Sequence, residues 1–287
     1  MWFDGKFVAD ADAHVSLLSH SLHYGGAVYE GIRFYQTADG RKAVFRLQDH
    51  LVRLHQSAQV MGMEMYPMKV LEDVIVQAVR MSSYEEGYIR PMVFRGEGIG
   101  LMASNISVHT MIAILPWAKG QESIRLVTSP IVRLHPGSTN IEVKVAGHYV
   151  NSYLAAAEAR KRDADDALLL DWQGYVAETS VANVFFLKGN RIFTPKRGSI
   201  FPGITRDTTM SLLAASGQIV EERNLSLSQA MFCDAMFLAG TACEILPVTR
   251  LDQREFCSYD SRVARCMDLY QQAIRHGLRE DWLTYVD

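Results

Sequence analysis

The first third of the chain alternates between two hydrophobic periods. Residues 31–47 contain two β-rich runs on either side of Asp39 and Gly40, a dipeptide that favours a two-residue hairpin turn. Apolar side chains then recur at helical spacing until Gly62, at Leu47, Leu51, Leu54, Ala58 and Met61. The same spacing predicts a second amphipathic helix over residues 70–81.

Two β-rich runs, at residues 88–95 and 109–117, follow these helices. Residues 1–117 are therefore predicted to form a small N-terminal α+β domain. Residues 118–123 (AKGQES) are polar, contain glycine and interrupt the pattern, so we interpret them as an interdomain linker. Residues 124–287 are then a larger C-terminal domain.

The C-terminal part mixes strands and helices. Strands are expected at residues 124–132, 141–145 and 167–170, and helices at residues 149–162, 206–216 and 259–276. Gly189 and Asn190 lie between two apolar runs, which favours another two-residue hairpin. Gly217 and Gly277 follow the last two helices as C-caps would. The fold class is thus α+β to α/β, in two domains.

Composition narrows the class of function. The chain has 287 residues, of which 48% are hydrophobic and 21% charged, enough for a well-buried core. Its 29 basic and 32 acidic residues give a formal charge of -3, so we expect a small-molecule substrate and neither a nucleic acid nor a membrane as partner. Four cysteines without a CxxC pair are typical of reduced thiols, and no leader or apolar run of about 20 residues is seen, so we expect a cytoplasmic location.

Lys144 lies in an alternating run, IEVKV, which places it on the same strand face as Glu142. A lysine on the polar face of a half-buried strand is usually only solvated. Here Gly147, His148 and Tyr149 follow at once, so a turn and a helix start point toward the same space as the amine. A lysine in such a place can hold an aldehyde as a Schiff base, and a phenol can bind the ring oxygen of the same molecule.

Glu178 lies in YVAETS, among small and apolar residues. One interpretation is an edge-strand carboxylate paired with a nearby lysine or arginine. The other is a partly buried carboxylate that pairs with a pyridinium nitrogen and so makes the ring an electron sink.

The run FPGITRD, residues 201–207, is typical of an anion site at a helix start. Its alternative is an ordinary capped helix. Thr241, after the run MFLAG, is a second candidate phosphate donor, and Arg53 is a candidate clamp whose alternative is a surface arginine. Together the lysine amine, the carboxylate and the anion site predict a binding site for pyridoxal phosphate.

Other motifs are weak. Gly96, Gly98 and Gly100 have neither the following helix nor the βαβ frame of a dinucleotide site. His20 and His23 lack metal-ligand spacing, so no metal is expected, and no G-x-S-x-G elbow is present.

The ordered motifs resemble the fold-type IV pyridoxal phosphate enzymes, most closely the branched-chain amino acid aminotransferases. The resemblance covers nearly the whole chain, through SLHYGGAVYEGIRFY (21–35), FRLQDHLVRLHQSAQ (45–59), YIRP (88–91), KVAGHY (144–149), EARKRDADDALLLD (158–171), ETSVANVFF (178–186), FPGITRD (201–207) and AGTACEILPV (239–248). It implies the two-domain architecture of the D-amino acid aminotransferase-like fold, with the cofactor between the domains.

The resemblance also implies roles for individual residues. Lys144 would form the internal aldimine and move the proton between the substrate Cα and the cofactor. The cofactor would be bound by Arg53, Lys144, Tyr149, Glu178, Phe201, Gly203, Ile204, Thr205 and Thr241. The substrate pocket would be lined by Tyr24, Tyr29, Tyr88, Arg90, Trp117, Thr241 and Ala242. Val181, Phe201 and Cys243 depart from the residues common in the family, which bears on substrate range.

The expected function is ping-pong transfer of the amino group of leucine, isoleucine or valine to 2-oxoglutarate, by a homodimer or higher homo-oligomer. Two alternatives stay open: a D-amino acid or (R)-amine transaminase on the same fold, and a phosphate- or aldehyde-binding protein that does not turn over.

Overall fold

The computed structural model describes residues 1–287 except Lys119, Ser258 and Asp287. The chain divides into two compact units, one of Met1–Ala118, Val143–His148 and Ala273–Asp287, and one of Lys119–Glu142 and Tyr149–Gln272. Two short segments beyond the predicted linker thus belong to the first unit. The predicted domain limits stay a prediction, and Lys119 of the linker lies outside the described residues.

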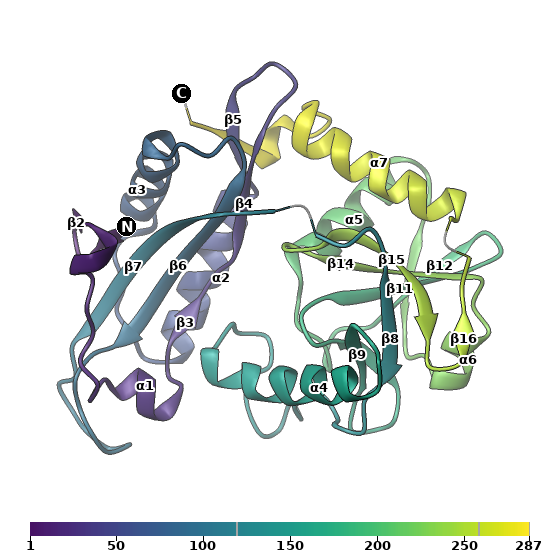
Figure 1. Ribbon diagram of the computed structural model, residues 1–287, viewed down its shortest axis with the longest axis horizontal. Coiled ribbons are helices and arrows are strands. Elements are labelled where there is room, and N and C mark those ends of the chain that lie inside the picture. The colour runs from purple at the N-terminus through teal and green to yellow at the C-terminus, as the bar shows by residue number, and fades with distance from the viewer. Residues whose placement is uncertain (119, 258, 287) are drawn as a thin grey trace. The chain divides into compact units, whose positions relative to one another are not determined.

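The first unit is built on an antiparallel sheet with strand order β17-β5-β4-β6-β7-β1-β2, with β3 also paired to β6 (Figure 1). The strands are β1 (Trp2–Phe3), β2 (Lys6–Phe7), β3 (Val28–Tyr29), β4 (Ile32–Gln36), β5 (Lys42–Phe45), β6 (Gly87–Arg95), β7 (Val108–Pro116) and β17 (Leu283–Tyr285). The helices are α1 (His20–Tyr24), α2 (Leu47–Val60) and α3 (Met68–Met81).

The apolar stripes of α2 and α3 form the core of this unit. Leu51, Leu54 and Ile75 are fully buried in one cluster with Val28 and Ile89 of the sheet. This is the packing that a stripe at helical spacing predicts. The predicted hairpin is confirmed, since β4 pairs with β5 around Asp39 and Gly40, but Gln36 pairs with Lys42 and the connection is therefore longer than the two residues expected.

The second unit has a mixed sheet with strand order β10-β9-β8-β15-β14-β11-β12-β13, with β16 paired to β15. The strands are β8 (Ile124–Thr128), β9 (Asp166–Leu170), β10 (Val176–Thr179), β11 (Asn183–Lys188), β12 (Arg191–Pro195), β13 (Val220–Arg223), β14 (Ala235–Gly240), β15 (Glu244–Leu251) and β16 (Arg254–Glu255). The helices are α4 (Tyr149–Lys161), α5 (Ile204–Ala215), α6 (Leu227–Met231) and α7 (Ser261–Arg275), of which α7 ends in the first unit.

Alternate residues of β11 serve opposite faces of this sheet. Val184 and Phe186 lie in the larger core cluster, whereas Phe185 points away from it and stacks on Phe237 with ring centroids 4.8 Å apart. The hairpin predicted around Gly189 is confirmed by the pairing of β11 with β12. No helix in the described part of the chain is both long and apolar enough to cross a membrane.

The strand predicted over residues 141–145 is wrong. These residues form a turn and one isolated bridge, between Val145 and Val28. The predicted alternation of burial nevertheless holds, with Ile141 and Val143 buried and Glu142 exposed. The alternation of apolar and polar residues therefore predicted correctly which side chains are buried. It did not predict the backbone, because these residues lack the ladder of hydrogen bonds that defines a strand.

The strand predicted over residues 124–132 ends at Thr128. Pro130 has no N–H to donate to a ladder, and the backbone N–H groups of Ser129 and Arg133 donate instead to Leu168 and Leu170. Arg133 is thereby fixed beside the end of β9.

Candidate active site

Lys144 is fixed to the first unit by its backbone. Its N–H donates to the Ser57 hydroxyl on α2 at 3.0 Å, and its carbonyl accepts from the Tyr29 N–H at 3.2 Å. Ala146 and Gly147 donate to Ala27 and Gly25 at 2.8 and 2.9 Å. Hydrogen bonds on both sides of Lys144 thus fix its backbone, while its side chain is partly exposed.

An aromatic and cationic group surrounds the lysine amine. The Lys144 Nζ lies 5.2 Å from the centre of the Tyr29 ring, and the Arg90 guanidinium lies 4.4 Å from the same ring. Arg90 Nη2 donates to the Tyr88 hydroxyl at 3.0 Å, and Tyr88 stacks on Trp117 with centroids 5.0 Å apart. Five of the predicted site residues therefore lie together in the first unit.

The Arg90 side chain is placed for a further partner. Its Nε is buried and has no hydrogen-bond partner among the described residues. Gly31 allows this arrangement, because a Cβ at that position would collide with the Tyr88 hydroxyl. An oxygen acceptor such as a carboxylate is what a buried, unpaired guanidinium N–H lacks.

Arg53, a predicted phosphate ligand, lies in a buried ionic cluster on α2. Its Nε and Nη2 donate to the two oxygens of Glu30 at 2.6 and 2.9 Å. His50 Nδ1 is 2.8 Å from the same carboxylate, which is fully buried. The structure therefore shows Arg53 paired with an acid, and its contact with a phosphate stays a prediction.

The two titratable partners of Arg53 have shifted pKa values. Burial by itself raises the pKa of Glu30, but the charges and hydrogen bonds of Arg53 and His50 outweigh it and hold that pKa well below its usual range. Burial lowers the pKa of His50 from 6.5, against the opposing effect of Glu30. Glu30 is therefore ionised, and neutral His50 donates its Nδ1 proton to it.

Glu178 lies in the second unit, on β10, and is only 5% exposed. Its Oε1 accepts from Arg133 Nε at 2.5 Å, and its Oε2 accepts from Asn183 Nδ2 at 3.0 Å. The backbone N–H of Phe201 donates to both oxygens, at 3.0 and 3.1 Å. Of the two interpretations of Glu178, the observed pairing is with an arginine, but it is made in the interior and not on a sheet edge.

Asn183 joins Glu178 to the predicted phosphate turn. Its Nδ2 also donates to the Phe201 carbonyl at 3.0 Å. Its Oδ1 lies so close to Gly203 that a Cβ there would collide with it. Phe201 and Gly203 are thus held against the carboxylate, and only glycine fits at residue 203.

The helix that follows this turn offers donors. Helix α5 begins at Ile204 with Gly203 as N-cap, a residue that has no side chain to cap it. The first N–H groups of a helix point out of its end and carry a partial positive charge. Ile204 and Thr205 are buried at this end, whereas Arg206 turns away and pairs with Glu222 at 2.6 Å. The arrangement suits an anion.

The remaining predicted ligands lie at turns and helix ends. Thr241 and Ala242 form the turn between β14 and β15, and Tyr149 is the half-buried first residue of α4. Cys243 is the third residue of this turn, and burial raises the pKa of its thiol to about 12, so it stays protonated. Tyr24 ends α1, and its hydroxyl accepts from the Gly100 N–H at 2.9 Å.

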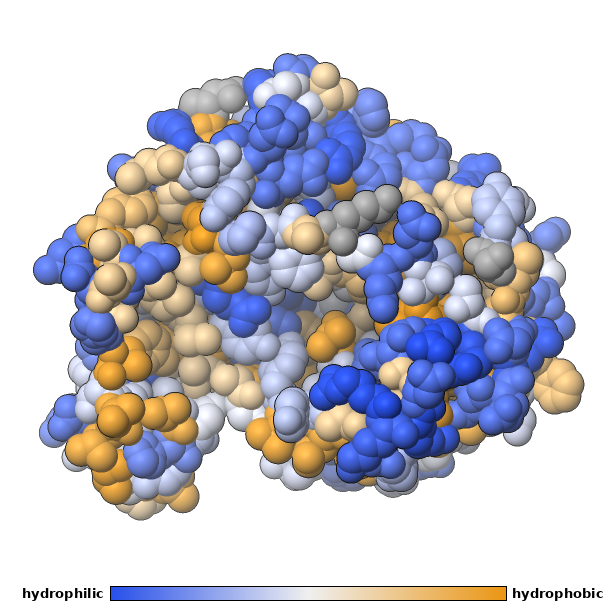
Figure 2. Space-filling view, viewed as in Figure 1, coloured by the Kyte–Doolittle hydropathy of each residue, from blue (hydrophilic) through white to orange (hydrophobic). Residues whose placement is uncertain are grey.

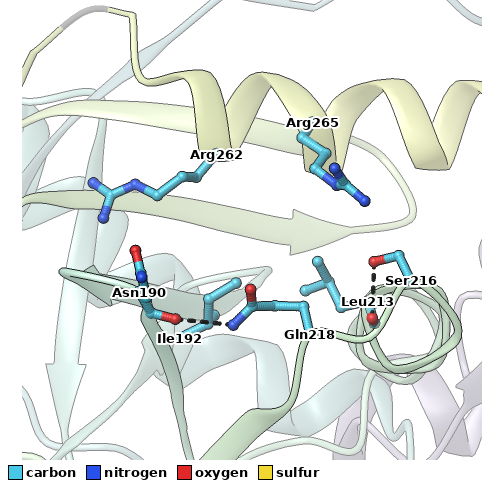
Figure 3. A pocket seen from close by; sticks show the side chains of 7 residues that line it. All are labelled: Asn190, Ile192, Leu213, Ser216, Gln218, Arg262 and Arg265. Carbon is cyan, nitrogen blue, oxygen red and sulfur yellow. Dashed lines mark hydrogen bonds between the residues drawn. The ribbon is translucent and has the colours of Figure 1, made fainter.

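A pocket of about 240 Å³ in the second unit does not coincide with any predicted site residue (Figure 3). It is lined by Asn190, Ile192, Leu213, Ser216, Gln218, Arg262 and Arg265. Arg262 is bound to Asp260 there, with Nη2 2.5 Å from its carboxylate. The predicted chemical groups lie elsewhere: the Lys144 amine in the first unit, and Glu178 with the start of α5 in the second.

Sequence reasoning missed four residues that shape the site, namely Glu30, His50, Arg133 and Asn183. Glu30, His50 and Asn183 lie inside motifs that were noted for other residues, so those motifs are the signal that could have pointed to them. Arg133 had no such signal, because a single arginine in an irregular segment looks like any surface arginine.

Comparison with known proteins gives a consistent result. Residues 27–251 match the family model described as Amino-transferase class IV. The chain is 40% identical over 263 residues to a branched-chain-amino-acid aminotransferase of Pseudomonas aeruginosa, covering 89% of this chain and 85% of that protein. It is 35% identical over 265 residues to the protein of the same name from Escherichia coli, covering 88% and 84%.

Solved structures agree. The branched-chain amino acid aminotransferase of Escherichia coli superposes with a TM-score of 0.96 at 32% identity, over 100% of this chain and 98% of that one. The enzyme of the same name from the thermophilic archaeon Thermoproteus uzoniensis, with norvaline, gives 0.95 at 32% identity, over 100% and 98%.

We predict that His50 makes the stability of the protein fall as the pH drops below about 6.5. Unfolded His50 takes up a proton near its ordinary pKa, whereas the folded residue has a lowered pKa and stays neutral. One such group contributes a slope of at most about 1.4 kcal/mol per pH unit. Urea unfolding of the wild type and of His50→Gln at about pH 7.5 and about pH 5.5, on either side of the ordinary histidine pKa, measures it. The variant should lose less stability between these pH values, and equal losses would contradict the prediction.

Proposed function

Because this chain belongs to the class IV aminotransferase family, we propose that it is a pyridoxal phosphate-dependent transaminase, moving the amino group of L-leucine, L-isoleucine or L-valine to 2-oxoglutarate. The names of the relatives favour this substrate class over D-amino acids or (R)-amines. Related branched-chain enzymes have been solved with N-(5'-phosphopyridoxyl)-L-glutamate and with pyridoxamine 5'-phosphate, which favours an enzyme over a simple aldehyde-binding protein.

The observation that carries the proposal is the set of chemical groups in each unit. The first unit offers the Lys144 amine beside Tyr29. The second offers Glu178, buried and already joined to the turn before α5, and the uncapped start of that helix. These are the three groups that the aldehyde, ring nitrogen and phosphate of one cofactor need. We propose that both sets bind the same cofactor molecule.

The remaining predicted ligands complete the binding. Arg53, Ile204, Thr205 and Thr241 would hold the phosphate, and Tyr149 the ring oxygen. Phe201 and Gly203, in the turn before α5, would lie against the cofactor ring. The backbone N–H groups of Thr241 and Ala242 would bind the substrate α-carboxylate.

When bound, the cofactor supplies an electron sink for the electrons left at the substrate Cα. The protein then has two tasks. Lys144 would take a proton from the substrate Cα and deliver it to the C4′ carbon of the cofactor. Glu178 holds the proton on the ring nitrogen, since an ionised carboxylate favours a cation beside it.

Arg90 and its aromatic neighbours would select the side chain. Tyr29, Tyr88 and Trp117 provide apolar surface for leucine, isoleucine or valine. The buried Nε of Arg90 would meet the second carboxylate of glutamate when the acid takes its turn in the same pocket. A ping-pong cycle requires one pocket to accept both, and this pair of features suits it.

We predict that Lys144→Ala abolishes the borohydride-reducible link to the cofactor and slows conversion of L-leucine to its oxo acid at least about a hundredfold, because the residue that moves the proton is gone. Mass spectrometry after reduction locates the label. Lys161→Ala, at the exposed end of α4, is the matched control and should behave as wild type. A reducible adduct retained in Lys144→Ala would overturn the assignment.

We expect Arg90→Met to slow the glutamate half-reaction at least about tenfold while the leucine half-reaction changes much less, since only the acid leaves a carboxylate unpaired. Single-turnover rates with each amino acid measure both. Arg33→Met is the comparison variant, as the Arg33 guanidinium lies over the Trp117 ring, 5.4 Å from its centre. A loss of the glutamate rate alone in Arg33→Met, or equal losses of the glutamate and leucine rates in Arg90→Met, would show that Arg90 does not bind the second carboxylate.

We also propose a homo-oligomer, at least a dimer, in the cytoplasm. Apolar side chains gather over α1 and the connection between β6 and β7, at the lower left of Figure 2. Large apolar residues in α1, just before it and in this connection are exposed: Leu17, Leu22, Leu101 and Met102 are between 63% and 95% exposed. Such a patch on one face is typical of an interface.

Light scattering should therefore show at least a dimer, and Leu101→Asp should weaken it because a charge would be buried in the interface. Ile219→Asp is the control, since Ile219 is 81% exposed in the second unit, away from this patch in the chain. A fully active monomer in the wild type would contradict the proposal.

A further inference from the structure

The Arg133 side chain has no role in the function proposed so far, yet the residue is only 8% exposed. Burying a guanidinium is costly unless it is paired. Glu178 is the one acid within ion-pair distance of it among the described residues, with Nε 2.5 Å from Oε1. The backbone of Arg133 is fixed as well, because its N–H donates to the Leu170 carbonyl at 2.8 Å.

The donors that Glu178 finds in Asn183 and Phe201 are neutral. Both orient the carboxylate, with the Asn183 amide at 3.0 Å and the Phe201 N–H at 3.1 Å from Oε2, but they bring no charge. Burial draws a carboxylate toward its protonated form unless a positive charge opposes it. Arg133 supplies the positive charge that opposes this.

The position of that charge decides where a proton lies. A ring nitrogen bound by Glu178 would share one proton with the carboxylate, either as a cation beside an anion or as a neutral pair. Arg133 touches the carboxylate directly, at 2.5 Å, so it would stabilise the anion more than it would repel a cation that lies farther from it than the carboxylate does. A cation placed in this way keeps the proton on the ring.

We propose that Arg133 is a positioning residue that keeps Glu178 ionised, so that the ring nitrogen of bound pyridoxal phosphate stays protonated. This rests on the proposed function, in which Glu178 binds that nitrogen. Arg133 acts through Glu178 and does not touch the reacting atoms.

Two substitutions separate charge from hydrogen bonding. Arg133→Gln keeps an N–H donor and removes the charge, whereas Arg133→Lys keeps the charge. Arg125→Gln is the control, since Arg125 forms its ion pair with Asp165 at the surface of the same unit. Circular dichroism establishes that each variant is folded.

The readout is the ¹⁵N chemical shift of the ring nitrogen in holoenzyme loaded with ¹⁵N-labelled pyridoxal phosphate. We expect Arg133→Gln to move the resonance from the pyridinium toward the neutral pyridine position. Its kcat with L-leucine should fall at least about tenfold with a change in KM below about threefold, because the loss is in the chemical step. Arg133→Lys and Arg125→Gln should keep the wild-type shift.

Each other outcome overturns the inference. A wild-type shift in Arg133→Gln would mean that the neutral donors suffice. A displaced shift in Arg133→Lys equal to that in Arg133→Gln would mean that the shape of the guanidinium, not its charge, matters. Failure of the proposed function gives a different result, since the wild type itself would then show no reducible cofactor on Lys144.

Discussion

The pairing of a buried carboxylate organises the second unit. Glu178 cannot stay charged in the interior without partners, and it finds them in a loop arginine, a strand asparagine and the backbone of the turn before α5. The same contacts fix that turn, so the carboxylate and the start of the helix keep one geometry. Asn183 tightens it further by bonding Phe201 and pressing against Gly203.

In the first unit, hydrogen bonds fix the backbone of the residue that carries the amine, Lys144. Lys144 is held by its backbone to Ser57 and Tyr29, in a short segment, Val143–His148, that belongs to this unit while its neighbours on both sides belong to the other. Arg53 and His50 of α2 both form hydrogen bonds with Glu30, which lies in the connection between β3 and β4. The protein thus keeps its amine and its carboxylate on separate frameworks, each stabilised internally.

Local pattern predicted much of this from the sequence. Apolar spacing gave α2 and α3, and glycine-containing dipeptides gave the hairpins, because both depend on neighbouring residues. The segment around Lys144 showed the limit: its alternating burial is real, but a strand needs a partner that the sequence does not display. Arg133 and Glu30 were not predicted for the same reason, because their partners are distant in the sequence. Arg133 and Glu178 are 45 residues apart, and Glu30 and Arg53 are 23 apart. The roles of the site residues rested on ordered motifs, and they stay predictions.

The central claim is that Lys144 and Glu178 bind one cofactor molecule at its two ends. A crystal structure of the protein with pyridoxal phosphate tests it most directly. We expect a covalent bond from Lys144 Nζ to the aldehyde carbon, and the ring nitrogen within about 2.6 to 3.2 Å of a Glu178 oxygen. A ring nitrogen bound by another group, with Glu178 turned away and held only by Arg133, Asn183 and Phe201, would contradict the account.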